Sequence, residues 1–237
     1  MYALTFLTLA LACTGVAWSV GWVAAPLGYA AVSFAALGVA YAGAGPGLLL
    51  KRADGRRGVS AWLLLGPYFA LNGLTFAAYR RLSREPAVTR VSADLSFGRR
   101  LTAAESLAEC PAGGWAGVLD LAAEFAEVGP LRQSPGYRSL PVLDGTAPTP
   151  AQLREALAWR AAITGPVYVH CALGHGRSAW VVVAFWLATG EVPTVAWYAA
   201  SHISSASSSS KSENTIDAGS QAPRWISPST CAGPQPE

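Results

Sequence analysis

The first 50 residues contain no Asp, Glu, Lys, Arg or His, and this run constrains the fold more than any other feature. A bilayer span needs about 20 apolar residues, so the run is long enough for two spans. Pro26, Leu27 and Gly28 offer a break between them, which predicts transmembrane helices over about 3–24 and 28–50. A cleaved signal peptide followed by one anchor is the alternative, but it would require a basic start and a short apolar core.

A second uncharged run of 22 residues, Gly58–Tyr79, is also long enough to cross. Basic residues flank it on both sides: Lys51, Arg52, Arg56, Arg57, Arg80, Arg81 and Arg84. The positive-inside rule places such residues in the cytoplasm, and a single crossing cannot place both flanks there. Either the segment re-enters and leaves on one side, or it spans and one flank breaks the rule. Residues 1–79 are thus predicted to be a transmembrane region of two or three helices.

The charge is sparse and unevenly distributed. Charged residues make up 13% of the chain, against about 25% in an average soluble domain. The mean hydropathy is +0.31, which argues against a wholly soluble protein and excludes a disordered chain. The net charge is +3 over residues 1–79, +4 over 80–100 and −4 over 101–237. The basic residues lie at a boundary rather than on one face, so we expect no nucleic-acid partner.

The four cysteines, Cys13, Cys110, Cys171 and Cys231, follow no regular spacing. This argues against a disulfide framework and favours free thiols in a reducing compartment. We expect Cys110 to be a core thiol rather than a redox partner of Cys171. We therefore expect a multi-pass membrane protein whose residues 80–237 lie on the cytoplasmic side.

The rest of the chain alternates between strand-like and helix-like segments. Short extended or buried segments typical of strands lie at 91–97, 117–121, 137–143 and 167–169. Two capping boxes, Thr102–Glu105 and Thr149–Gln152, predict helix starts, and a long apolar stretch at 178–189 ends at Gly190. The predicted fold class is α/β, with a central, mostly parallel sheet flanked by helices.

Three regions are predicted after the membrane part: a basic juxtamembrane linker at 80–90, an α/β domain at 91–199, and a Ser/Pro-rich tail at 200–237. The tail has the composition of a disordered segment.

One stretch, Val169-His-Cys-Ala-Leu-Gly-His-Gly-Arg-Ser178, carries the chemistry. A cysteine and an arginine are separated by five residues, between a predicted strand and a predicted helix. A thiolate is a nucleophile, and a helix N-terminus with a loop of backbone N–H groups can lower the pKa of a thiol. The same N–H groups can hold a phosphate, and the planar guanidinium of Arg177 can bind two phosphate oxygens.

This stretch resembles the HCxxGxxRS signature of the protein tyrosine and dual-specificity phosphatases, because His170, Cys171, Gly174, Arg177 and Ser178 all match it. The resemblance covers about residues 91–190 and implies a dual-specificity-phosphatase-like domain of a membrane-anchored bacterial type. It further implies attack by Cys171 on phosphorus, a phosphocysteine intermediate, phosphate binding by Arg177, and assistance to the leaving thiolate by Ser178. The phosphate-binding loop would be Ala172, Leu173, Gly174, His175, Gly176 and Arg177.

The mechanism also needs a general acid to protonate the leaving oxygen. The family supplies an Asp from a loop upstream, and Asp144 follows an extended segment and precedes a capped helix. Asp144 is therefore the predicted acid, with Asp120 and Glu124 as rivals. Asp120 lies inside a predicted strand, which suits a structural role better. The Asp144–Thr149 loop is also similar, over a short stretch, to the phosphatidylglycerophosphate phosphatase subgroup.

The remaining roles and substrates stay open at this point. By the resemblance, His170 orients the loop, while His175 faces either the substrate or the solvent. No cofactor and no metal site are expected. The primary hypothesis is a membrane-anchored phosphatase acting on phosphorylated proteins; a phospholipid phosphatase and a non-catalytic pseudophosphatase are the alternatives. A sulfur-transfer enzyme of the rhodanese type is a further reading, which Asp144 and Ser178 disfavour. Residues 172–176 contain no Lys, which argues against a phosphoinositide substrate. The sequence after Gly190 departs from the family pattern, so the resemblance does not decide whether the enzyme is active.

Overall fold

The computed structural model describes residues 1–21 and 24–190. The predictions for the tail at 200–237 and for the end of the α/β domain, 191–199, lie outside these residues.

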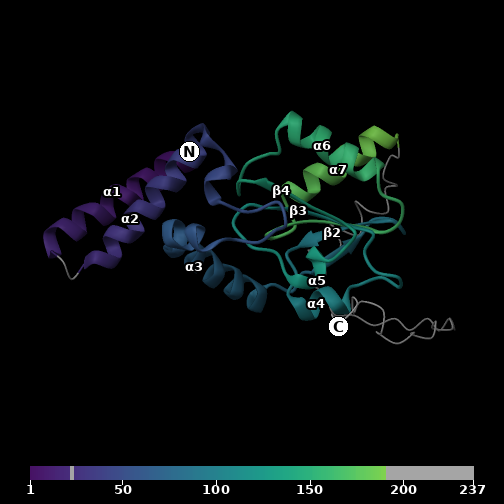
Figure 1. Cartoon of the computed structure of the whole chain (residues 1–237), viewed down its shortest axis with the longest axis horizontal. Helices are drawn as coiled ribbons and strands as arrows, with labels where there is room; N and C mark the ends of the chain where they lie inside the picture. Colours follow the sequence, from purple (N-terminus) through teal and green to yellow (C-terminus); the bar gives the residue numbers. More distant parts are fainter. Residues whose placement is uncertain (22–23, 191–237) are drawn as a thin grey trace, which may run out of the picture.

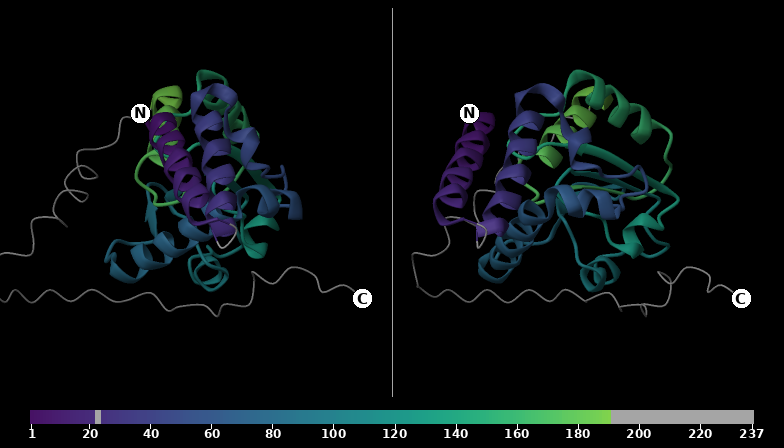
Figure 2. Two further views of the ribbon diagram at one scale, coloured as in Figure 1. Left: turned by 90° about the vertical axis from the view of Figure 1, so that its left-hand side faces the viewer. Right: turned by 60° about the vertical axis from the view of Figure 1, so that its left-hand side comes forward.

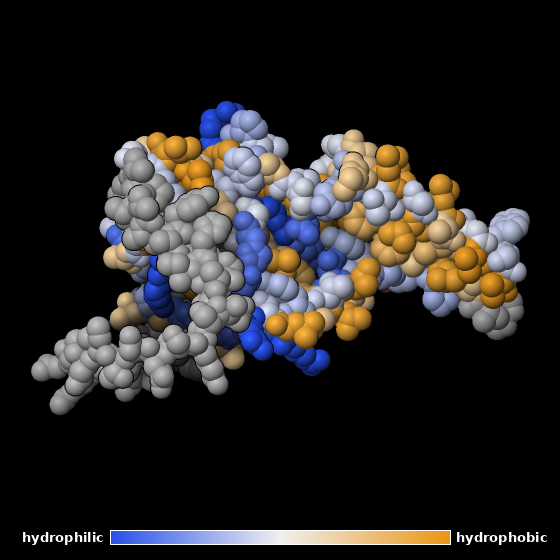
Figure 3. Space-filling view, turned by 180° about the vertical axis from the view of Figure 1, so that it is seen from behind, coloured by the Kyte–Doolittle hydropathy of each residue, from blue (hydrophilic) through white to orange (hydrophobic). Residues whose placement is uncertain are grey.

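The N-terminal run forms a helical hairpin that extends away from the rest of the molecule (Figure 1). Helix α1 (Tyr2–Val20) packs along α2 (Ala25–Val39), and the two lie side by side in both views of Figure 2. Helix α2 continues into a π-helical turn, η2 (Ala40–Ala44), and a 3-10 turn, η3 (Pro46–Leu49), follows. Hydrophobic residues gather on the surface of the hairpin, at the right of Figure 3. Both helices are long and apolar enough to cross a membrane, as expected.

The break between the two helices differs from the prediction. Helix α1 ends at Val20 and α2 begins at Ala25, so Pro26 lies in the first turn of α2 rather than in the break. A proline is tolerated there because the first N–H groups of a helix have no partner within it. At the other end, the candidate span stops at Ala44 rather than at residue 50, because Gly43 and Gly45 adopt positive φ angles of 134° and 79°.

The second uncharged run forms the 24-residue helix α3 (Val59–Leu82), which is also long and apolar enough to cross. Pro67 lies inside the helix, with a non-helical residue at Leu65. A proline removes one helical hydrogen bond and clashes with the preceding turn, so a local kink is expected. The helix continues on both sides of it.

Both ends of α3 are attached to the same α/β domain. Before its start, the Arg57 guanidinium donates hydrogen bonds to the carbonyls of Ala123 and Glu124. At its end, Arg80 forms a 2.9 Å ion pair with Glu105. A helix that crosses a bilayer leaves its two ends on opposite faces. These contacts therefore favour the interpretation in which this segment does not cross.

A five-stranded sheet forms the centre of the domain, in the order β1-β2-β5-β3-β4. Its strands are β1 (Val88–Arg90), β2 (Leu95–Arg99), β3 (Gly117–Ala122), β4 (Gly136–Val142) and β5 (Val167–Cys171). Only β1 is antiparallel to its neighbour; the other pairs are parallel. The predicted α/β fold with a mostly parallel sheet is confirmed. The predicted strand at 91–97 is instead the turn between β1 and β2 followed by the start of β2, so the sheet begins inside the predicted linker at 80–90.

Helices cover both faces of the sheet (Figure 1): α4 (Ala103–Ala108) and α5 (Gly129–Arg132) on one, and α6 (Pro150–Ala161) and α7 (Arg177–Thr189) on the other. Alternate residues of β5 point to opposite faces. Val167 and Val169 join the core under α6 and α7, whereas Tyr168 joins the core on the other face. All five residues of β5 are buried, so the strand that carries Cys171 is fixed on both sides.

The hairpin shares a hydrophobic core with the domain. Ala123, which follows β3, and Leu143, which follows β4, are buried in one cluster with residues of the three N-terminal helices and η3: Ala10, Phe34, Leu37, Ala40, Leu49, Ala61, Leu65, Tyr68 and Phe69. Burying such side chains is the main favourable term in folding. The loops after β3 and β4 are therefore packed directly against the predicted membrane region.

Candidate active site

The loop between β5 and α7, residues 172–176, lies at the carboxyl end of the central strand. Ligands of parallel α/β folds bind at this edge of the sheet. Gly174 has a φ of 90°, and a Cβ added there would lie 2.7 Å from the backbone N of Arg99. Only glycine fits both this positive φ angle and the close approach to β2. Gly174 therefore allows the loop to turn tightly around Cys171.

The thiol of Cys171 is buried at the base of this loop and is a free thiol. The backbone N–H of Gly174 donates to its Sγ over 3.2 Å. The Ser178 hydroxyl lies 3.5 Å from the Sγ and donates to the carbonyl of Gly174 over 3.0 Å. Hydrogen bonds to a thiolate stabilise its charged form. The sulfur of Cys171, the predicted nucleophile, is thus in contact with the hydroxyl of Ser178.

Arg177 begins α7, and its buried guanidinium is fixed by three groups. It forms a bidentate pair with the carboxylate of Glu124, at 2.8 and 2.5 Å. It also donates to the carbonyl of Val142 and to Asp144, over 2.8 and 2.9 Å. Burial alone lowers the pKa of Arg177, but the hydrogen bonds and charge of Glu124 raise it above its ordinary value. Arg177 therefore stays charged at the edge of the pocket.

Asp144 lies on the loop after β4, and its side chain is 62% exposed. It lines a pocket of about 330 Å³ together with Cys171, Arg177 and residues of the loop between β5 and α7. Among the described residues that line this pocket, Asp144 carries the one carboxyl group. The rival Glu124 is buried against Arg177, and Asp120 is completely buried. Of the three carboxyl groups, Asp144 is therefore placed best to reach a leaving group.

The buried imidazole of His170 points away from the pocket into a cluster of charges. Its Nε2 lies 2.9 Å from Glu127 and 3.9 Å from Asp120. Asp120 in turn forms a 2.5 Å ion pair with Lys51 and accepts a hydrogen bond from Tyr137. Burial lowers the pKa of His170, but the charges of Glu127 and Asp120 raise it above its ordinary value. This contact set fits the expected role of orienting the loop.

Asp120, Glu127 and His170 are also residue types that bind metals, and their ligand atoms lie within 4.8 Å of one another. This group could not be predicted from the sequence, because His170 lies far along the chain from Asp120 and Glu127. The ammonium of Lys51 already neutralises Asp120, and His170 pairs with Glu127. The three candidate ligands are thus in contact with one another and with Lys51.

His175, at the rim of the phosphate loop, contacts the end of α3. Its Nε2 lies 2.8 Å from Glu85 and 3.1 Å from the hydroxyl of Tyr79. The side chain is 59% exposed and lines the pocket. The side chain of His175 thus faces the solvent and the pocket at once, which combines the two orientations considered from the sequence.

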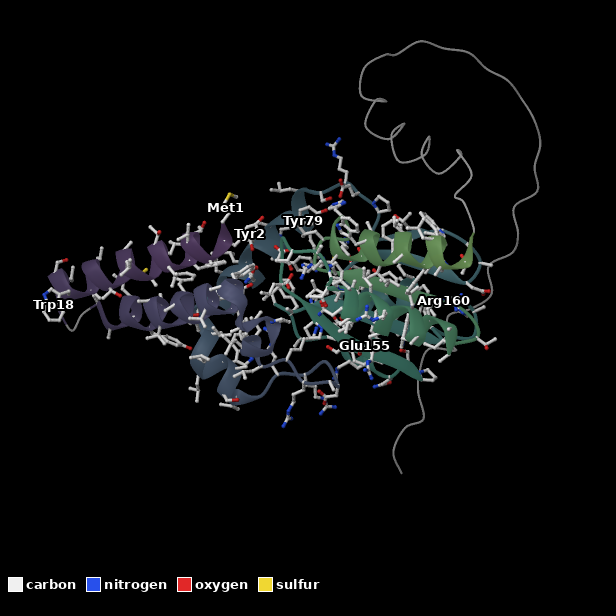
Figure 4. All side chains as sticks on the ribbon, turned by 90° about the horizontal axis from the view of Figure 1, so that it is seen from above. Met1, Tyr2, Trp18, Tyr79, Glu155 and Arg160 are labelled. Carbon is white, nitrogen blue, oxygen red and sulfur yellow. The ribbon has the colours of Figure 1, made fainter. Side chains whose placement is uncertain are left out.

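Two tyrosines of the hairpin contact the loop that carries Asp144. The Tyr41 hydroxyl donates to the backbone carbonyl of Asp144 over 2.9 Å. A Cβ added at Gly145 would lie 2.6 Å from the hydroxyl of Tyr2, so the two residues are in close contact. Figure 4 shows Tyr2 at the domain end of the hairpin and Trp18 at its far end. These contacts join segments more than 100 residues apart, and no sequence pattern indicated them.

The cysteines differ in part from the expectation. Cys13 and Cys171 are free thiols, whereas Cys110 is disulfide-bonded. The prediction that Cys110 is a core thiol is therefore wrong. Cys231 lies outside the described residues.

The sequence matches no protein family model, and no curated protein matches it significantly. Two solved structures are similar to part of this chain. A crystal structure of Tk-PTP, a protein tyrosine phosphatase, in a glycine-to-alanine mutant form is 25% identical, with a TM-score of 0.36, and the match covers 45% of this chain and 75% of that one. A crystal structure of Tk-PTP in the active form is 28% identical, with the same TM-score, and covers 45% and 76%.

Proposed function

We propose that this chain is a membrane-anchored, cysteine-dependent phosphatase that hydrolyses phosphomonoesters through a phosphocysteine intermediate. The observation that carries the proposal is the contact set around Cys171: a backbone N–H at 3.2 Å, a hydroxyl at 3.5 Å, and a pocket shared with Arg177 and Asp144. A nucleophile, an anion-binding group and an acid thus meet in one pocket.

The reaction proceeds in two steps. The thiolate of Cys171 attacks phosphorus, the bond from phosphorus to the leaving oxygen breaks, and Asp144 gives that oxygen its proton. Arg177 binds the oxygens of the transferred phosphoryl group. Water then attacks the phosphocysteine and gives its proton to Asp144. Ser178 donates a hydrogen bond to the departing thiolate, and inorganic phosphate is released.

The hairpin anchors the protein. If α1 and α2 cross the bilayer, the N-terminus, the basic residues 51–57 and the catalytic domain all lie on one side. The positive-inside rule then makes this side the cytoplasm, because these residues lie next to the spans. The disulfide at Cys110 is more typical of an oxidising compartment, but a charge rule that acts on short loops is the stronger guide to orientation.

Hydrolysis of p-nitrophenyl phosphate tests the proposal. Membranes carrying the protein should release nitrophenol, and Cys171→Ser should abolish the release, because a hydroxyl in place of the thiolate is a poor nucleophile at neutral pH. Cys13→Ser is the matched control, since Cys13 is the other free thiol among the described residues. Release by Cys171→Ser at the wild-type rate would refute a cysteine phosphatase. No release by either protein would favour the non-catalytic pseudophosphatase.

A further inference from the structure

A second cavity adjoins the catalytic pocket. It has a volume of about 230 Å³ and lies between α3 and the phosphate loop. It shares Asp144 and Leu173 with the catalytic pocket, so a molecule whose phosphate lies at Cys171 can extend directly into it.

Most of the surface that lines this cleft is apolar. Phe76 of α3 packs against Phe125 of the loop after β3, with ring centroids 5.0 Å apart, and Leu173 lies on the phosphate loop side. The neighbouring surface of α3 exposes Leu71 (49%) and Leu74 (70%). The cleft thus runs from the phosphate site to an exposed apolar helix face.

The polar side chains of the cleft already have partners, and its two carboxylates, Glu124 and Asp144, both accept hydrogen bonds from Arg177. The Asn72 amide and the Thr75 hydroxyl both donate to carbonyls one turn earlier in α3. The Tyr79 hydroxyl contacts Glu85 and His175. A bound peptide needs partners for its own backbone N–H and C=O groups, and their absence costs free energy. An apolar chain has no such need.

The position of the cleft also indicates an apolar ligand. Helix α1 has 19 residues, which at about 1.5 Å per residue approaches the thickness of a bilayer core, about 30 Å. Its exposed Trp18 end would therefore reach one side of the bilayer when its Tyr2 end lies at the other. Tyr2 contacts Gly145, which lies next to Asp144 on the loop after β4. The catalytic pocket consequently lies at the level of the lipid headgroups.

We propose that the substrate is a membrane lipid with a phosphomonoester headgroup, whose apolar part enters the cleft between α3 and the phosphate loop. This inference rests on the proposed function. The phosphoryl group passes from the lipid oxygen to the Sγ of Cys171 and then to water, which leaves the lipid alcohol in the bilayer. A phosphorylated protein, the primary hypothesis from the sequence, is the competing outcome.

The test compares three substrates of the full-length protein: phosphatidic acid in phosphatidylcholine vesicles, a phosphotyrosine peptide, and p-nitrophenyl phosphate. Wild-type protein should hydrolyse the lipid faster than the peptide. Thr75→Trp should lower the ratio of the lipid rate to the nitrophenyl phosphate rate by about tenfold, because each methylene group kept out of the cleft loses its burial. Asn72→Trp should lower the ratio likewise.

Leu63→Trp is the matched control, because Leu63 is an exposed residue of the same helix that does not line the cleft. It should leave the ratio unchanged. A faster reaction with the peptide, or an unchanged ratio in both cleft variants, would overturn the lipid proposal while leaving the phosphatase intact. If the wild-type protein does not hydrolyse p-nitrophenyl phosphate, the proposed function itself is refuted.

Discussion

At the scale of single residues, the site divides into groups that are close in sequence and groups that are not. Cys171, Arg177 and Ser178 lie within eight residues, so a single motif was enough to predict them. The partner of Arg177 could not be predicted in that way. Glu124 was considered only as a rival acid, and its bidentate contact with Arg177 depends on β3 and β5 being neighbours in the sheet.

Asp144 should matter according to the leaving group. Asp144→Asn cannot donate a proton, so hydrolysis of phenyl phosphate, whose leaving group is poor, should slow by about 10²- to 10⁴-fold. Hydrolysis of p-nitrophenyl phosphate should slow much less, because nitrophenolate leaves without protonation. The measurement is the rate of the first release of phenol or nitrophenol, before the second step, in which Asp144 takes a proton from water with either substrate. Equal slowing would mean that Asp144 is not the acid, and Asp94→Asn, at an exposed residue distant in sequence, serves as the control.

At the scale of elements, both predicted capping boxes are confirmed. The side chains of Thr102 and Thr149 accept hydrogen bonds from the residues three positions on, at the starts of α4 and α6. Such local signals depend on a few neighbouring residues and can therefore be predicted from sequence. Whether α3 crosses the membrane could not be predicted, because the answer depends on contacts at its two ends with Ala123, Glu124 and Glu105.

The two ends of α3 should be accessible from the same side of the membrane. Gly58→Cys and Ser83→Cys flank the helix and should both react with a membrane-impermeant thiol reagent applied to one side only. Trp18→Cys, at the exposed far end of the hairpin, should react from the opposite side. Each variant is compared with the unchanged chain, which corrects for the native cysteines. Labelling of the two α3 positions from opposite sides would show that α3 crosses.

At the scale of the whole molecule, the hairpin and the catalytic domain form a single packed unit. Ala123 and Leu143 are buried against the hairpin, Lys51 is paired with the buried Asp120, and Tyr41 holds the backbone of Asp144. The sequence separated the membrane region from the catalytic domain by composition, and that division concealed these contacts. The N-terminal helices are therefore part of the structure of the candidate active site.

In the proposed reaction, Cys171 carries the phosphoryl group during turnover. Ser178→Ala should slow the departure of the thiolate, so the phosphocysteine should accumulate when this variant is mixed with p-nitrophenyl phosphate and quenched in denaturant. Mass spectrometry of the digested protein should then find one phosphoryl group on the peptide that contains Cys171, and none in the Cys171→Ser variant. Turnover with the phosphoryl group on another residue, or with no covalent intermediate at all, would contradict this account.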